Sequence, residues 1–384
     1  MTALSYNQVA LVPKYSTLRS RSEADVSVEF LGRKLALPIL PANMESVLNA
    51  DIACWLSENS FGYIHHRFSD TLSFVRRANQ ESWKLVSISV GVKQLDKDLL
   101  VTITKEGLRV DWITIDVAMG HHVLVKEMIE FIKGLDFKSA LGDYVTDSFA
   151  IREQRAGPGR GFTSIPLSYR PKIIAGNVAT PEGVLDLAEW GASAVKVGVG
   201  ASKVCTTRHQ TGFGLPMFSC VKECVQATHR RVLSQRFANY KVKQDYPDYD
   251  APDPTLIPII ADGGARENGD IAKSIVAGAT LTMIGGMVAA CTDAPGESVY
   301  DGLVSTNPSV PMPPIARKKF HGSASSRQKQ EHKHVEGIEL EIPCNGMTIA
   351  ELYQDIRESL QSAVSYAGAT SLGGLKDVQY VEVK

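Results

Sequence analysis

The sequence contains few cysteines, no long apolar run and no excess of either charge. Six cysteines are spread over 384 residues without the spacing of a disulfide framework. With no signal peptide visible at the N-terminus, we expect reduced thiols and a cytoplasmic protein. No apolar segment approaches the ~20 residues that a membrane span needs. Lys and Arg number 41 and Asp and Glu 42, which argues against general binding to nucleic acid or to a membrane surface.

The composition is that of an ordinary globular protein. Apolar residues make up 44% of the chain and charged residues 22%, which excludes a disordered or low-complexity chain. The length alone suggests two or three domains, but single α/β barrels often exceed about 250 residues.

Short β-branched runs alternate with helical patterns along most of the chain. Continuous apolar runs are typical of buried parallel strands, and eight of them occur: Leu37–Leu40, Gly62–Ile64, Leu85–Val90, Trp112–Val117, Lys172–Ala175, Ala194–Gly198, Ile257–Ala261 and Leu281–Ile284. Helical patterns cover about 50–58, 70–79, 121–134, 181–190, 214–229 and 268–277, with room for another between 90 and 112. Eight strands with helical crossovers favour a (β/α)8 TIM barrel over an open sheet.

Two stretches interrupt the alternation, at about 138–170 and 230–256. Each follows a helix and precedes a strand, which places it on the barrel face opposite the catalytic one. We interpret both as surface insertions, with docking or assembly as the alternative. After residue 287 the pattern is that of a flap, about 321–337, followed by a helix near 348–364. The sequence thus predicts a single barrel domain over 1–384.

The densest chemical signal is the segment Gly198–Arg208, which directly follows the sixth predicted strand. Its position places Cys205 on the catalytic face of a barrel. Small residues before the cysteine allow a tight turn and a close approach to a ligand. Nearby Lys203 and Arg208 favour a thiolate, and two threonines, Thr206 and Thr207, follow. The alternative is a phosphate-binding or turn loop in which the cysteine is a bystander.

Paired glycines follow the last two predicted strands. Asp262, Gly263 and Gly264 follow the seventh, and Gly285 and Gly286 follow the eighth. Loops at these places often bind phosphate through backbone N–H groups, and Asp262 could accept hydrogen bonds from a ribose. Ordinary glycine turns are the alternative. Together with Cys205, these residues indicate a site for a phosphorylated, sugar-bearing ligand beside a cysteine.

Other polar residues at strand ends are more ambiguous. Asp116 ends the fourth predicted strand and would point into the site. His65–Arg67 ends the second, where a cationic role near a dinucleotide phosphate and a solvated rim are both open. We interpret His121 and His122 as the start of a helix rather than metal ligands. We also interpret Cys220 and Cys224 as structural residues rather than metal ligands, because they lie in an apolar helical stretch and no second Cys or His pair follows them.

Taken together, these motifs resemble those of the IMP dehydrogenase/GMP reductase family, over nearly the whole chain apart from the two insertions. The matching segments are Pro41–Met44, Ile115–Ala118, Ile174–Val178, Val197–Arg208, Ala261–Gly264, Gly269–Ser274, Met283–Gly286, Val335–Gly337 and Ser365–Gly368. The resemblance is greater to the reductases. No tandem CBS insertion separates the second predicted strand from the third, and the short flap between Gly322 and Glu336 lacks the Arg–Tyr pair that activates water in the dehydrogenases.

The resemblance implies NADPH-dependent reductive deamination of GMP to IMP, with release of ammonia. Cys205 would attack the purine as a thiolate and form a thioimidate, while Thr207 and Glu336 would move the protons. The family pattern further implies a homotetramer that binds neither nucleic acid nor membrane, and it includes a monovalent cation such as K⁺. The alternatives are an IMP dehydrogenase, which oxidises IMP to XMP with NAD, and a purine-nucleotide-binding regulatory protein that has lost turnover.

The resemblance also assigns binding residues. For GMP these are Asp262, Gly263, Gly264, Gly285, Gly286, Gly322, Ser323, Ala324, Lys203, Lys333 and Gly337. For the cofactor they are Asp116, Val117, Ala118 and His66, with Ser365, Tyr366, Ala367 and Gly368 completing the site of a neighbouring subunit. For the cation they are Gly200, Ser202, Cys205 and Arg208.

The cysteine loop departs from the family pattern at three positions. The usual Gly-Pro-Gly-Ser is Gly200-Ala-Ser-Lys203. Lys203 would replace the phosphate-binding serine with a point charge. Ser202 places a Cβ where a cation-binding loop needs a close backbone approach.

Overall fold

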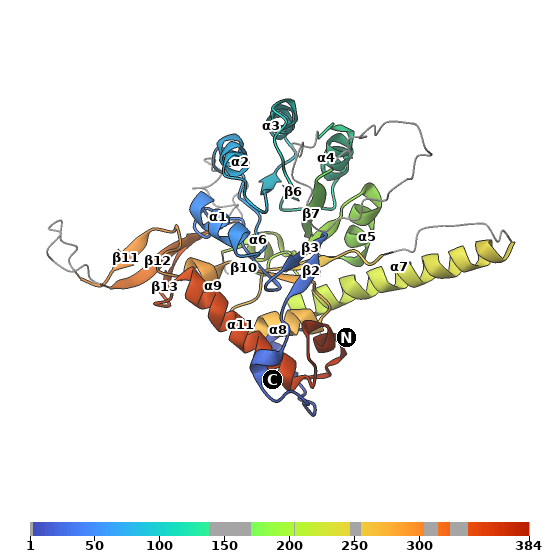
Figure 1. Ribbon diagram of the computed structural model, residues 1–384, viewed down its shortest axis with the longest axis vertical. Coiled ribbons are helices and arrows are strands. Elements are labelled where there is room, and N and C mark those ends of the chain that lie inside the picture. The colour runs from blue at the N-terminus through green and yellow to red at the C-terminus, as the bar shows by residue number, and fades with distance from the viewer. Residues whose placement is uncertain are drawn as a thin grey trace, which may run out of the picture.

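A parallel sheet surrounded by helices forms the centre of the molecule (Figure 1). The computed structural model describes residues 3–137, 170–202, 204–245, 255–302, 314–322 and 337–383. Within these ranges seven parallel strands run in the order β4 (Ile39–Pro41), β10 (Leu281–Ile284), β9 (Ile259–Asp262), β8 (Ala194–Val197), β7 (Lys172–Val178), β6 (Trp112–Asp116) and β5 (Ser87–Val90). They are largely buried, as expected for a sheet covered on both faces.

Helices follow these strands in the alternating order that the sequence predicts. They are α1 (Ala50–Glu58), α2 (Thr71–Gln80), α3 (Gln94–Lys105), α4 (Val123–Gly134), α5 (Pro181–Trp190), α6 (Thr207–Thr211), α7 (Met217–Asp245), α8 (Asn268–Val276), α9 (Gly286–Ala289) and α11 (Ile349–Tyr366). The predicted (β/α)8 barrel is therefore confirmed as the architecture. None of the helices in the described ranges combines the length and apolar character that a membrane span requires.

The second predicted strand, Gly62–Ile64, is not part of the described sheet. Its place is taken by a segment that meets β5 through one isolated bridge, His65 with Ile88. The His65 N–H donates to Ser87 O at 3.1 Å, and the Ser89 hydroxyl donates to His65 O at 2.7 Å. Because a side chain makes the second bond, the segment stays beside β5 without forming a regular ladder.

Helix α7 continues well beyond its predicted end. Its 29 residues run to Asp245, into the segment predicted as an insertion from residue 230. The first proline after its start region is Pro247, and no glycine lies inside it, so nothing in the backbone ends the helix earlier. The distal part extends away from the barrel (Figure 1), and Leu233, Phe237 and Tyr240 on it are exposed.

Smaller elements frame the barrel. Near the N-terminus are η1 (Tyr6–Gln8), β1 (Val9–Leu11), η2 (Arg21–Glu23) and the hairpin of β2 (Val28–Phe30) with β3 (Arg33–Leu35). Strands β11 (Ser298–Tyr300), β12 (Ile315–His321) and β13 (Glu339–Pro343) form an antiparallel sheet, and η3 (Leu372–Asp377) precedes β14 (Tyr380–Glu382), which pairs with β1. A capping box between Thr348 and Glu351 begins α11. Of the predicted flap, the structure describes only its two ends, 321–322 and 337.

Candidate active site

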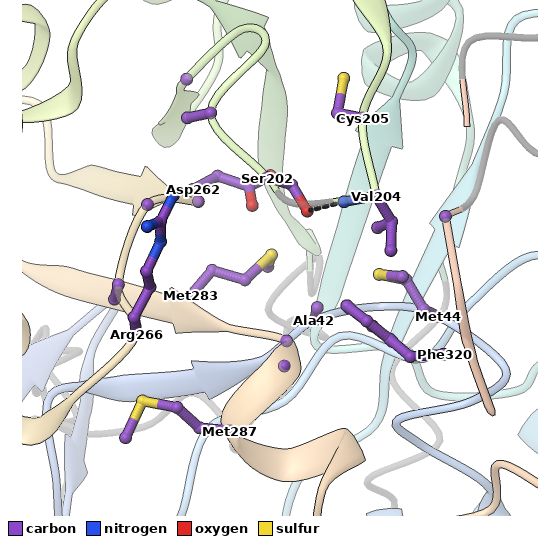
Figure 2. Close-up of a pocket in the computed structure, with 18 of the residues that line it drawn as sticks. Ala42, Met44, Ser202, Val204, Cys205, Asp262, Arg266, Met283, Met287 and Phe320 are labelled. Carbon is purple, nitrogen blue, oxygen red and sulfur yellow. Dashed lines mark hydrogen bonds between the residues drawn. The ribbon is translucent and has the colours of Figure 1, made fainter. Parts of the chain in front are cut away.

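A cavity of about 1010 Å³ opens at the carboxyl ends of the barrel strands. Residues that follow β4, β6, β8, β9 and β10 line it, together with Phe320 of β12 and with Gly322 and Gly337 at the two ends of the flap. Figure 2 shows Cys205, Met44 and Phe320 on one side of this space and the Met283 side chain on the other. The cavity is at the end of the barrel where α/β barrels carry their catalytic groups.

Gly198 connects β8 to the cysteine loop, and any other residue there would force the backbone to move. Gly198 has φ of +148°, and a Cβ there would lie 2.1 Å from Asp262 O. The loop then turns tightly, with the Cys205 N–H donating to Ser202 O at 3.2 Å. Cys205 also forms an antiparallel bridge with Gly337, so the backbone of the loop is joined to the end of the flap.

The sulfur of Cys205 has a hydroxyl beside it. Its Sγ lies 3.2 Å from Oγ1 of Thr207, the first residue of α6. Cys205 and Thr207 both line the cavity, so a thiol and a hydroxyl that could carry a proton border the same space. The sequence placed this hydroxyl near the cysteine, and its proposed catalytic role stays a prediction.

The glycine pairs after β9 and β10 meet at the same end of the barrel. Gly263 and Gly264 have φ of +105° and +83°, a region that favours glycine. Gly285 approaches Phe320 so closely that an added Cβ would lie 3.3 Å from its Cζ. Both pairs line the cavity, and they offer the close backbone approach that a phosphate group needs.

Polar side chains that line the cavity converge from several strands on one ammonium group. Nζ of Lys196, on β8, lies 2.7 Å from Oδ1 of Asp116 and 3.1 Å from Oδ2 of Asp262. Asn177, on β7, donates to Asp262 Oδ2 at 2.8 Å. Burial alone would lower the pKa of Lys196, but the two carboxylates outweigh it and hold that pKa above its usual range.

Sequence reasoning did not single out Lys196, although the strand that contains it was predicted. The available signal was a lysine inside an otherwise apolar barrel strand, Ala194–Gly198. Such a residue is buried on both faces of the sheet and needs a partner for its charge. Which carboxylates supply that partner depends on contacts between strands distant in sequence.

An apolar slot borders Cys205. Met44, Val204, Met283 and Phe320 line the cavity and are each at most 8% exposed. In Figure 2 Met44 and Phe320 lie close to Val204, with Met283 on the other side of the open space. Thioether and aromatic surfaces suit a flat heteroaromatic ring, since both contact such rings favourably.

Of the predicted His65–Arg67 cluster, Arg67 lines the cavity and His66 does not. His66 stacks on His65 with ring centroids 4.5 Å apart. Burial lowers the pKa of His66, which favours its neutral form, and its predicted contact with the cofactor stays a prediction. Arg67 is the cationic residue at that position, and its Nε is buried without a hydrogen-bond partner among the described residues.

The remaining predicted cofactor residues divide between the cavity and the outer surface. Asp116, Val117 and Ala118 line the cavity. Residues 365–368, at the end of α11, are not among its lining residues, and Tyr366 is 59% exposed. Their predicted contact is with the cofactor of a neighbouring subunit, and it stays a prediction.

The predicted cation residues line a second, smaller pocket of about 400 Å³ that shares part of the cysteine loop with the cavity. Gly200, Ser202, Cys205 and Arg208 all border it. The Ser202 carbonyl already accepts the N–H of Cys205. Within the described ranges no group of three His, Cys, Asp or Glu side chains could hold a metal ion.

Several predicted residues fall outside the part of the chain that the structure describes. These are Lys203, Ser323, Ala324, Lys333 and Glu336. Of the residues interpreted as structural, His122 is the N-cap of α4, His121 Nε2 lies 2.7 Å from Asp186 Oδ2, and Cys220 and Cys224 are buried on α7.

Comparison with known proteins gives the family. The chain matches the IMP dehydrogenase / GMP reductase domain over residues 3–148 and 163–384. It is 38% identical over 385 residues to a GMP reductase of Leptothrix cholodnii, covering 99% of this chain and 96% of that protein. It is 37% identical over 388 residues to a GMP reductase of Mesoplasma florum, covering 100% and 99%.

A third relative, a GMP reductase of Staphylococcus carnosus, is 36% identical over 389 residues, covering 100% of this chain and 97% of that protein. The unmatched residues 149–162 fall inside the insertion predicted at 138–170. The matches and the barrel geometry agree, and the chain belongs to the IMP dehydrogenase/GMP reductase family.

Proposed function

We propose that this protein reduces GMP to IMP with release of ammonia, using NADPH. The observation that carries the proposal is the 3.2 Å contact between Cys205 Sγ and Thr207 Oγ1 inside the cavity. The similarity to GMP reductases over nearly the full chain supports it.

The proposed chemistry begins with the sulfur. The Cys205 thiolate attacks C2 of the guanine, and the C2–N bond to the exocyclic amine breaks once that nitrogen is protonated, which leaves a thioimidate. Thr207, with Glu336 as its partner, handles the protons. The bound nicotinamide cofactor supplies hydride to C2. The C–S bond then breaks, which returns the thiolate and frees IMP.

The cavity offers a place for each part of GMP. The apolar slot of Met44, Val204, Met283 and Phe320 would hold the purine, and Asp262 the ribose. The phosphate would meet the backbone N–H groups of Gly264, Gly285 and Gly286, with Lys203 as a charge. Gly263, Gly322–Ala324, Lys333 and Gly337 would complete the substrate site.

Two features support a dinucleotide beside GMP. Asp116, Val117 and Ala118 form one wall of the cavity, and the orphaned Nε of Arg67 is a donor that a cofactor oxygen could satisfy. We further infer a homotetramer in which Ser365–Gly368 reach a neighbouring cofactor site. A K⁺ ion would bind at the carbonyls of Gly200, Ser202 and Cys205, next to Arg208.

The short flap favours reduction over dehydrogenation. Residues 323–335, between Gly322 and Glu336, contain no Arg–Tyr pair. A dehydrogenase must hydrolyse its covalent intermediate with an activated water, and this segment lacks the pair that its relatives use for that step. Release of ammonia needs no such group.

The test is NADPH oxidation with GMP, run beside NAD reduction with IMP, in potassium and in sodium buffer, with products identified by chromatography. NADPH loss matched by IMP and ammonia is the expected result. NADH and XMP would instead identify a dehydrogenase. GMP binding without either reaction would favour a regulatory protein, for which the altered Gly200–Lys203 loop is the motivating observation.

A further inference from the structure

Lys196 carries a charge in the interior of the barrel. It lies on β8, and its side chain is 2% exposed. Moving an ammonium group out of water costs several kcal/mol in real proteins, so a lysine at this place needs strong compensation. None of the substrate, cofactor or cation assignments above includes it.

The compensation comes from two carboxylates that belong to different halves of the site. Nζ of Lys196 contacts Asp116 Oδ1 at 2.7 Å and Asp262 Oδ2 at 3.1 Å. Asp116 ends β6 on the side proposed for the cofactor, and Asp262 ends β9 beside the glycines proposed for the phosphate. Because both oxygens touch one nitrogen, they are no more than about 6 Å apart, a range in which like charges raise each other's pKa.

The other groups around Asp116 are weaker partners. Arg67 contributes its charge from the segment after Ile64, and Asn43, after β4, also favours the anionic form of Asp116. Burial by itself would raise the pKa of Asp116, and Lys196 is the main influence that reverses this and lowers it. Across Lys196 the next charged group is Asp262, which Asn177 also supports.

We propose that Lys196 is a positioning residue that keeps the cofactor carboxylate Asp116 ionised while it orients the ribose carboxylate Asp262. One ammonium therefore sets the charge state of one ligand site and the geometry of the other. This rests on the proposed function for the roles of the two aspartates. The arrangement makes cofactor binding independent of pH near neutrality, since Asp116 stays an anion there.

Removing the charge of Lys196 should make NADPH binding depend on pH. In Lys196→Met, Asp116 would be opposed only by Arg67 and Asn43 while Asp262 remains close, so its pKa should rise toward neutrality. Below the new pKa, NADPH affinity should fall by roughly tenfold per pH unit, the limit for one protonation. GMP affinity should change much less with pH, because Asp262 keeps its bond from Asn177.

The experiment measures NADPH and GMP dissociation constants by fluorescence and calorimetry between about pH 6 and pH 8. Wild type and Lys84→Met should give flat NADPH profiles; Lys84 is a surface lysine with a 59% exposed side chain, paired with Glu58. Lys196→Met should give the sloping profile. The double variant Lys196→Met/Asp116→Asn should bind NADPH weakly but without the slope, because the titrating group is gone.

A flat Lys196→Met profile with wild-type affinity would overturn the proposal, as would an unchanged slope in the double variant. If Lys196→Met fails to fold, the double variant should recover a cooperative melt, since the uncompensated carboxylate is removed. If it does not, Lys196 serves the fold alone and the proposal is wrong. Absence of GMP reduction by wild type would instead refute the proposed function, and the NADPH profiles would still report on Lys196.

Discussion

Cys205 and Thr207 stand out at the residue scale, because their side chains meet within the cavity at 3.2 Å. The sequence predicted both residues and their common face, since the loop directly follows a barrel strand. It could not predict the partner of Lys196, because that contact joins strands distant in sequence. Arg67 was part of a predicted cluster, but only packing decides which of three consecutive side chains faces the cavity.

Replacing the sulfur should separate binding from chemistry. Cys205→Ser should bind GMP with near wild-type affinity and lose turnover, because a serine hydroxyl without a strong base is a poor nucleophile. Calorimetry with GMP and an assay of NADPH oxidation measure the two properties. Cys54→Ser, a partly exposed cysteine remote from the cavity, is the matched control and should keep full activity. Turnover by Cys205→Ser would remove the covalent step.

The hydroxyl beside the sulfur should affect rate more than binding. Thr207→Val should lower kcat by roughly a hundredfold or more, the usual contribution of a positioned acid–base group, with a small change in the KM for GMP. Thr211→Val lies on the same helix and loses two bonds to the backbone, one to Thr207 O and one from Phe213 N–H, so it should stay close to wild type. Equal losses in both variants would point to a disturbed helix instead.

At the scale of elements, the backbone constrains the site through glycines. Gly198 has no room for a side chain, whereas a Cβ at Gly134, at the end of α4, meets nothing within 4 Å. Gly198→Ala should therefore displace the loop from β9 and abolish turnover, and Gly134→Ala should keep it. Steady-state kinetics of the purified variants measure this; an active Gly198→Ala enzyme would show that the loop position is not critical.

Helix α7 contains two phenylalanines in contrasting environments. Phe218 is 1% exposed and packs on the barrel, whereas Phe237 on the distal part is 60% exposed. Phe218→Ala should cost about 3–5 kcal/mol of unfolding free energy, and Phe237→Ala less than about 0.5 kcal/mol. Urea denaturation of both variants makes the comparison. A large loss at Phe237 would mean that the distal part of α7 is covered in solution.

The length of α7 could have been predicted, unlike the partners of Lys196. The sequence from Met217 to Asp245 lacks glycine and proline, and only the change from apolar to basic residues suggested an end near residue 230. Charge does not end a helix; it only indicates that the helix leaves the core. The absence of a regular strand at Gly62–Ile64 was harder to predict from the sequence. It depends on the Ser89 hydroxyl, which donates to His65 O in place of a backbone N–H.

For the whole molecule, buried histidines make stability depend on pH. Burial lowers the pKa of His65 from 6.5 to about 3. A histidine that is buried in its neutral form makes its full contribution to folding stability above the pKa that it has in the unfolded chain. This contribution is lost as the pH falls toward its lower pKa in the folded protein. The loss for this one group should approach roughly 1.4 kcal/mol per pH unit between about pH 6 and pH 4.

Comparing variants isolates this contribution. The unfolding free energy of His65→Gln should fall less steeply with decreasing pH than that of wild type, since glutamine does not titrate. His122→Gln, an exposed cap of α4, is the control and should follow the wild-type slope. Identical slopes for all three proteins would assign the acid sensitivity to other groups.

The bridge between Cys205 and Gly337 has a consequence for alignment. The Ile338 N–H donates to Val204 O at 3.0 Å, so the chain entering the nucleophile is hydrogen-bonded to the chain leaving the flap. Glu336, the proposed proton partner of Thr207, immediately precedes that junction in sequence. If Cys205 and Glu336 have the roles proposed above, a shift of this short pairing would displace the attacking sulfur and the proton partner together.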